Sequence, residues 1–187
     1  QGVSSAASDV YKRQTVYYGS DIHLGHNNIL SFCNRPFKDL EEMRDSFIGE
    51  CYLTLKKNDD VYLLGDIAFN KAKETLNLLL DCPGNFYLVI GNHDHNAVVD
   101  HPLWKNKYTL KSVKDPDADL PVVLCHYPIE HWDKRRYGAI HLHGHTHGNI
   151  SKDVSLITNR FDVGYDATGR WLSTLPQVVT NYKLPIV

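Results

Sequence analysis

The sequence lacks an excess of either charge: its 187 residues contain 20 Lys and Arg against 22 Asp and Glu, a formal net charge of −2 at pH 7. A dedicated binder of nucleic acid or of anionic membranes carries a basic excess, so the composition argues against both classes. Long apolar runs are absent too. None approaches the roughly 18 residues of a membrane span, and the first residues lack the apolar core of a signal peptide, so we expect a cytoplasmic location and no membrane partner.

Cysteine is also scarce, because the chain has four and they form no C-x-x-C pair. Their wide spacing argues for reduced, buried thiols rather than a disulfide framework or a zinc ribbon. A Cys–His nucleophile at Cys125 and His126 is disfavoured, because neighbouring residues of a strand point to opposite faces.

Residues 1–14 show no sustained apolar period. We expect them to be a disordered or appended tail, and residues 15–187 to form a single domain.

The first half of this domain alternates predicted strands with predicted helices. The clearest helix has Asp39 as its N-cap, Glu42 at the capping-box position and a stripe of apolar residues to about Leu55. A short helix ending near residue 33 and another over 71–81 complete the pattern, which indicates an α/β fold. The strands are predicted at 15–19, 61–64 and 86–90.

Helices become scarce in the second half, where turns with Pro, Gly and Asp separate short apolar runs. A second sheet packed against the first would bury these runs without more helices. Strands are predicted at 107–114, 121–126, 139–143 and 155–163, with a further candidate at 178–182.

The most distinctive stretch is 141–148, HLHGHTHG, which places four histidines at alternate positions and adds two glycines that permit a tight turn. Four other stretches place Asp, Asn or His at the end of an apolar run. Because the carboxyl ends of parallel strands share one edge of a sheet, we expect these side chains to gather there. The candidate metal ligands are Asp21, His23, Asp66, Asn92, His126, His145 and His147.

This mixture of carboxylate, imidazole and amide oxygen suits first-row divalent ions and lacks the thiolates of a structural zinc site. Seven ligands exceed what one four-coordinate ion needs, so we expect two divalent ions, with Mn²⁺ favoured and Fe, Zn, Ni or Co as alternatives. Two ions about 3.5–4 Å apart can bind a phosphate and convert a bridging water into hydroxide. His93 is then placed to act as general acid, with Asp94 orienting it.

In this order, D-x-H, GD, GNHD, a lone His and GHTH resemble the signature blocks of the calcineurin-like metallophosphoesterase superfamily, over roughly residues 15–165. The resemblance implies two packed mixed β-sheets flanked by helices, a four-layer sandwich. It also implies that one metal is held by Asp21, His23 and His147 and the second by Asn92, His126 and His145, with Asp66 bridging and His93 and Asp94 catalytic.

The implied activity is binuclear metal-dependent hydrolysis of a phosphate ester, by hydroxide attack with a histidine general acid. A phosphodiester is slightly favoured over a small phosphomonoester as substrate. The alternative is a non-catalytic scaffold or binding module with the same fold. Such a protein is expected to lose ligands or the acid, and this chain has all of them, so the enzyme is favoured.

Two residues outside the blocks could face the substrate. Arg35 could grip a phosphate oxygen bidentately, and His26 could contact the ester. The alternatives are that Arg35 pairs with a carboxylate and that His26 caps a helix. His141 and His143 are expected to pack, or to support the ligands from behind.

Overall fold

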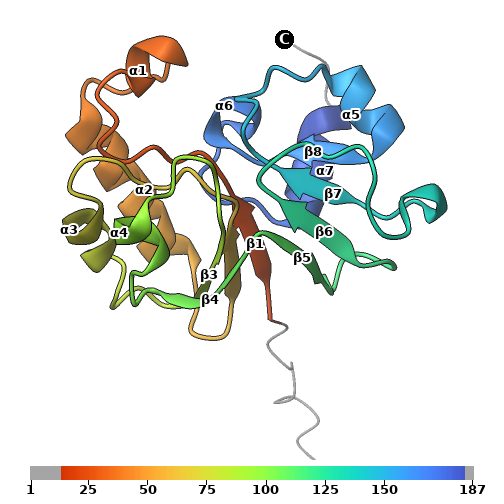
Figure 1. The fold of residues 1–187 in the computed structure, drawn as a ribbon, viewed down its shortest axis with the longest axis horizontal. Helices are drawn as coiled ribbons and strands as arrows, with labels where there is room; N and C mark the ends of the chain where they lie inside the picture. Colours follow the sequence, from red (N-terminus) through yellow and green to blue (C-terminus); the bar gives the residue numbers. More distant parts are fainter. Residues whose placement is uncertain (1–13, 184–187) are drawn as a thin grey trace, which may run out of the picture.

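The computed structural model describes residues 14–183, which form an α/β fold of two four-stranded sheets flanked by helices (Figure 1). The tail predicted at 1–14 lies outside the described residues except for Gln14. The helices are α1 (Ile29–Phe32), α2 (Leu40–Thr54), α3 (Ala72–Asn77), α4 (Asn96–Val99), the 3₁₀ turn η1 (Arg135–Tyr137), α5 (Lys152–Thr158), α6 (Tyr165–Thr168) and α7 (Leu175–Lys183).

The first sheet has the order β1-β2-β3-β4, and its named strands are all parallel. The three strands predicted in the first half are confirmed as β1, β2 and β3, although the prediction of two mixed sheets describes only the second sheet. The strands are β1 (Val16–Gly19), β2 (Asp60–Leu63), β3 (Asn85–Val89) and β4 (Trp104–Tyr108).

The second sheet has the order β5-β6-β7-β8 and is mixed, with β5 and β6 antiparallel and the other pairs parallel. The single strand predicted over 107–114 is wrong. It is two strands in different sheets, because the chain crosses from the β3 side to the β6 side at Thr109. The strands are β5 (Leu110–Val113), β6 (Val122–Cys125), β7 (His141–His143) and β8 (Arg160–Asp162).

Two apolar clusters explain why residues 61–64, in β2 and just after it, read as an unbroken apolar run. Along β2 and the residue after it, Val61 and Leu63 belong to the cluster under α2 and α3, whereas Tyr62 and Leu64 belong to the cluster shared with the second sheet and α7. Because successive side chains of a strand point to opposite faces, both faces are covered and every position is apolar.

The predicted helix that begins at Asp39 is confirmed as α2. The Asp39 carboxylate accepts the backbone N–H of Glu42 at 2.9 Å, which satisfies one of the free donors of the first turn. The buried residues Met43, Phe47 and Cys51 follow at four-residue spacing and form the inward stripe of the helix.

The strands predicted at 155–163 and 178–182 are largely wrong, because both stretches contain helices. Ser151 caps α5 through a bond from the backbone N–H of Val154, and Asn159 ends that helix in the left-handed conformation before β8 begins. In α7 the buried residues Leu175, Val178 and Tyr182 recur at spacings of three and four, which is the period of a helix.

The four cysteines are free, and three of them are buried. In the described part of the chain, no helix combines the length and the apolar character that a membrane crossing requires.

Packing of α2 predicts a position-dependent loss of stability. Phe47 is completely buried, so Phe47→Ala should lower the free energy of unfolding by about 3–5 kcal/mol, through lost apolar burial and the cavity left behind. Leu53 on the same helix is 90% exposed, and Leu53→Ala is the matched control with an expected change within about 0.5 kcal/mol. Urea unfolding measures both, and equal losses would contradict this packing.

Candidate metal centre

All seven predicted ligands lie beyond the carboxyl ends of strands, and these strands come from both sheets. Asp21 and His23 follow β1, Asp66 follows β2, and His126 follows β6. Backbone hydrogen bonds join the loops, including one from Asp21 N to Gly65 O at 3.0 Å and one from Gly144 N to His126 O at 3.0 Å. The first sheet and the second sheet therefore each contribute to one site.

The backbone at this site is strained. Among residues 14–183, nine residues other than glycine have positive φ, and five of them are predicted ligands. Each such residue costs about 1–3 kcal/mol and persists only where the surroundings enforce it, which is typical of functional sites. The five ligands are Asp21 (53°), His23 (59°), Asp66 (56°), His145 (67°) and His147 (47°).

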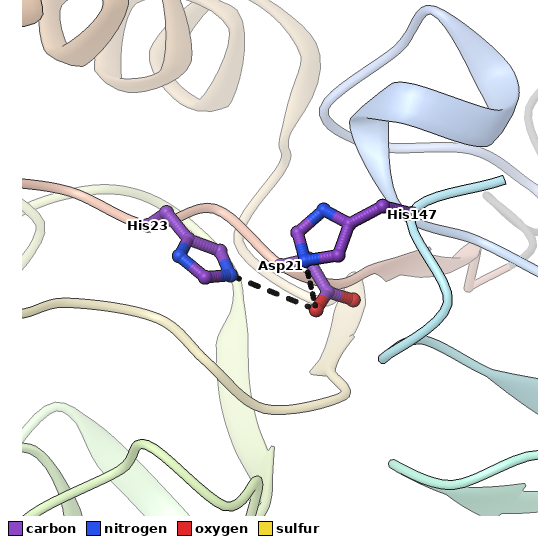
Figure 2. A group of neighbouring side chains, drawn as sticks. All are labelled: Asp21, His23 and His147. Carbon is purple, nitrogen blue, oxygen red and sulfur yellow. Dashed lines mark ion pairs between the residues drawn. The ribbon is translucent and has the colours of Figure 1, made fainter. Parts of the chain in front are cut away.

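Two imidazoles face one buried carboxylate without bonding to it. Figure 2 shows the rings of His23 and His147 pointing toward Asp21, whose Oδ1 lies 3.8 Å from His23 Nε2 and 3.7 Å from His147 Nε2. Asp21 Oδ1 and His23 Nε2 are buried and have no hydrogen-bond partner. The separations exceed a hydrogen bond but are less than twice the metal–ligand distance of about 2.1 Å, so the group fits a divalent ion.

Asp66 lies between this group and a second one. Its Oδ2 is 3.9 Å from His23 Nε2 and 3.6 Å from His126 Nε2. Asn92 Oδ1 is 2.9 Å from the same His126 nitrogen, and the His145 and His126 rings are 5.1 Å apart. A carboxylate within reach of both groups is the arrangement that a bridging ligand requires.

Three of the candidate histidine ligands are held in the same way, with a partner at Nδ1. Nδ1 of His126 is 2.7 Å from Leu64 O, Nδ1 of His147 is 2.6 Å from Asp166 Oδ2, and Nδ1 of His23 is 3.3 Å from His26 Nδ1. In each ring the other nitrogen, Nε2, faces a carboxylate. A partner on one ring nitrogen that fixes the ring for coordination through the other is the usual support of a metal-binding histidine.

Asp166 was not predicted from the sequence. Asp166 is the second residue of α6, in a stretch without a ligand motif. Only the folding of the chain brings it beside the site. Its carboxylate accepts two bonds from Arg35, from Nε and Nη2 at 2.8 Å each. Arg35 also donates to the backbone carbonyls of Asp21 and Ile22, at 2.7 and 2.8 Å. The Arg35 guanidinium therefore pairs with a carboxylate of the protein, as the alternative interpretation expected, instead of being positioned to grip a phosphate.

The contacts among His147, Asp166 and Arg35 shift the pKa values of His147 and Asp166 in opposite directions. The hydrogen bond to Asp166 raises the pKa of His147 above its ordinary value. Burial would raise the pKa of Asp166, but the bonds from His147 and Arg35 outweigh burial and hold this pKa well below the ordinary range. Asp166 is therefore a permanent anion behind the His147 ring.

Glycines allow the loops to pass against the two carboxylates. A Cβ at Gly144 would overlap Ser20 Oγ and Asp21 Oδ2, and a Cβ at Gly91 would overlap Asp66 Oδ1. Glycine is needed at both positions for close approach.

His93 and Asp94 have different surroundings from those predicted. The His93 side chain is exposed beside the metal centre, and its backbone N–H donates to Asp66 Oδ1 at 2.9 Å. The Asp94 carboxylate accepts the N–H groups of Asp66, Ile67 and Gly91, so it ties the loops after β2 and β3 together instead of orienting the His93 ring. Burial raises the pKa of Asp94, against the lowering effect of these bonds.

The remaining histidines singled out in the sequence pack close to the candidate site. His26 does not cap a helix, since Asn28 is the N-cap of α1, and its ring stacks on Phe69. His141 is buried, its two ring nitrogens each lie 3.0 Å from a backbone carbonyl oxygen, of Val123 and Tyr127, and burial lowers its pKa to about 4. His143 is buried, with Nδ1 2.8 Å from Gly144 O.

Comparison with solved structures shows the fold. A protein of unknown function from Aquifex aeolicus, AQ665, is similar at a TM-score of 0.71 and 21% identity, over 90% of this chain and 99% of that chain. A conserved uncharacterised protein from Streptococcus pneumoniae, described as a predicted phosphoesterase, gives a TM-score of 0.34 at 19% identity, over 72% of this chain and 63% of that chain. The second likeness is too small to carry an argument.

No protein-family model matches the chain. The gene 66 protein of Mycobacterium phage L5 is 27% identical, over 84% of this chain and 89% of the phage protein. The uncharacterised protein MJ1445 of Methanocaldococcus jannaschii is 31% identical over 136 residues, which is 72% of this chain and 70% of the relative. On this similarity, the chain belongs to the same family as MJ1445.

Proposed function

We propose that this protein is a metal-dependent hydrolase of phosphate esters that uses two divalent ions, with Mn²⁺ favoured. The observation that carries the proposal is the set of three histidines whose Nδ1 atoms have partners and whose Nε2 atoms face Asp21 and Asp66. When bound, two ions at such a site supply stabilisation of the charge on a phosphate and a water that is nucleophilic near neutral pH.

The residues divide into two groups around Asp66. The orphaned Oδ1 of Asp21 and the 3.6–3.9 Å separations around Asp66 support this division. The first ion would be held by Asp21, His23 and His147, the second by Asn92, His126 and His145, and both by Asp66.

His93 is proposed to donate the proton that the departing oxygen needs. The bond from its backbone N–H to Asp66 holds it beside the centre, and its ring is open to solvent on the same side. A positioned histidine of this kind contributes about 10²–10⁴-fold to rate. Exposure of both His93 and His145 leaves room for a bulky ester, and we therefore favour a phosphodiester over a small phosphomonoester.

Arg35, Asp94 and Asp166 act by position. Asp166 fixes the His147 ring, Arg35 fixes Asp166 and the backbone at Asp21, and Asp94 fixes the backbone at Asp66. The site can depend on each of these three residues without any of them contacting the substrate.

The direct test is hydrolysis of bis(p-nitrophenyl) phosphate and p-nitrophenyl phosphate by metal-stripped protein, before and after addition of Mn²⁺. We expect turnover that requires the metal, with the diester hydrolysed faster. Binding of two ions without hydrolysis of either ester would contradict the proposal and favour a scaffold role.

Replacement of the proposed acid should separate chemistry from metal binding. His93→Ala should lower the turnover of the Mn²⁺-loaded protein about 10²–10⁴-fold and leave two ions bound, because the His93 ring is not a ligand. His95→Ala, at an exposed neighbouring histidine, is the matched control and should keep both. Metal content is measured by elemental analysis, and unchanged turnover in His93→Ala would remove this residue from the acid role.

Neutralising Asp166 should weaken metal binding indirectly, through the loss of its bond to the proposed ligand His147. Asp166→Asn keeps the side-chain size but removes the charged acceptor at His147 Nδ1, and we expect Mn²⁺ affinity to fall about 10–100-fold. Calorimetric titration with Mn²⁺ measures this, with the exposed Asp153→Asn in α5 as control. Equal affinities in the wild type and Asp166→Asn would show that Asp166 has no positioning role.

A further inference from the structure

A group of aromatic side chains adjoins the candidate metal centre. Its outer member, Phe32, is exposed and contacts none of the candidate ligands. We call the side chains of His26, Phe32 and Phe69 the aromatic shelf. The His26 ring stacks on Phe69 with centroids 4.6 Å apart and planes at 19°, and Phe32 meets His26 edge-on at 6.1 Å. The three rings form an unbroken chain of aromatic contacts.

The inner end of the shelf reaches the reacting groups. The Phe69 ring lies 5.0 Å from the ring of the ligand His23 and 5.4 Å from the ring of His93. Phe69 is also fixed through its backbone, because its N–H donates to Leu24 O at 2.8 Å in the loop after β1. The shelf is therefore attached to the same loops that carry the ligands.

The outer end of the shelf is open. Phe32 is 71% exposed at the end of α1, which projects at the top of the view in Figure 1. The next residue, Cys33, has its Sγ 3.4 Å from His147 Nδ1, so this end of α1 borders the metal centre. A single exposed apolar side chain is ordinary, but one continuous with a stacked surface that leads to His93 marks a place for an apolar group.

We infer that the aromatic shelf binds a planar aromatic group on the leaving side of the ester. The inference rests on the proposed function. Hydrolysis adds water to phosphorus and breaks the P–O bond to the departing alcohol or phenol, whose oxygen takes the proton from His93. Since His93 adjoins Phe69, the group attached to that oxygen lies along the shelf. Stacking and edge contacts between aromatic rings then favour an aromatic over an aliphatic group by about two- to tenfold.

The test compares binding of phenylphosphonate and methylphosphonate, which share the anionic group and differ in the aromatic ring. Calorimetry on the Mn²⁺-loaded protein gives both affinities without turnover. Phe32→Ala removes the outer ring at an exposed position, Phe32→Tyr retains an aromatic ring, and Leu53→Ala is a control for loss of an exposed apolar side chain elsewhere.

We expect the wild type, Phe32→Tyr and Leu53→Ala to prefer phenylphosphonate by about two- to tenfold, and Phe32→Ala to show a smaller preference, because the Phe69 and His26 rings remain. No preference in the wild type, or an unchanged preference in Phe32→Ala, would overturn the inference. Hydrolysis of bis(p-nitrophenyl) phosphate by the same samples separates the failures. Metal-dependent turnover without a phenyl preference rejects the shelf alone, whereas no turnover and no binding of either phosphonate rejects the proposed function and the shelf with it.

Discussion

The structure depends on one buried carboxylate, that of Asp21. The Nε2 atoms of His23 and His147 face it but do not hydrogen-bond to it. Burial of Asp21 without partners on Oδ1 is costly, and the nearby His23 Nε2 is orphaned in the same way. A cation among these atoms would remove both costs at once. The left-handed backbone at five candidate ligands and the glycines packed against Asp21 and Asp66 are further costs that serve the same arrangement.

The fold makes this arrangement possible because two sheets end at one edge. The parallel first sheet delivers Asp21, His23 and Asp66, and the mixed second sheet delivers His126 and His147. Neither sheet contains all seven candidate ligands. The core cluster shared by the sheets therefore holds the candidate metal centre together as well as the fold.

The strands β1, β2 and β3 and the candidate ligands could be predicted from the sequence, because both leave local signals. Residues 61–64 are apolar throughout since both faces are buried, and Asp66 follows this run after one glycine. The strand β4 was not predicted, since Trp104 is its one buried residue. The helices α5 and α7 were missed because they are rich in β-branched residues, such as Ile157 in α5 and Val178 and Val179 in α7, which favour strands. The role of Asp166 could not be predicted, since its partner Arg35 is 131 residues away and only the folded chain brings them together.

Anomalous X-ray scattering from crystals grown with Mn²⁺ would locate the bound ions. We expect two manganese positions, one among Asp21, His23 and His147 and one beside His126, with the Asp66 carboxylate contacting both. A single position, or two positions that do not share Asp66, would contradict the binuclear centre.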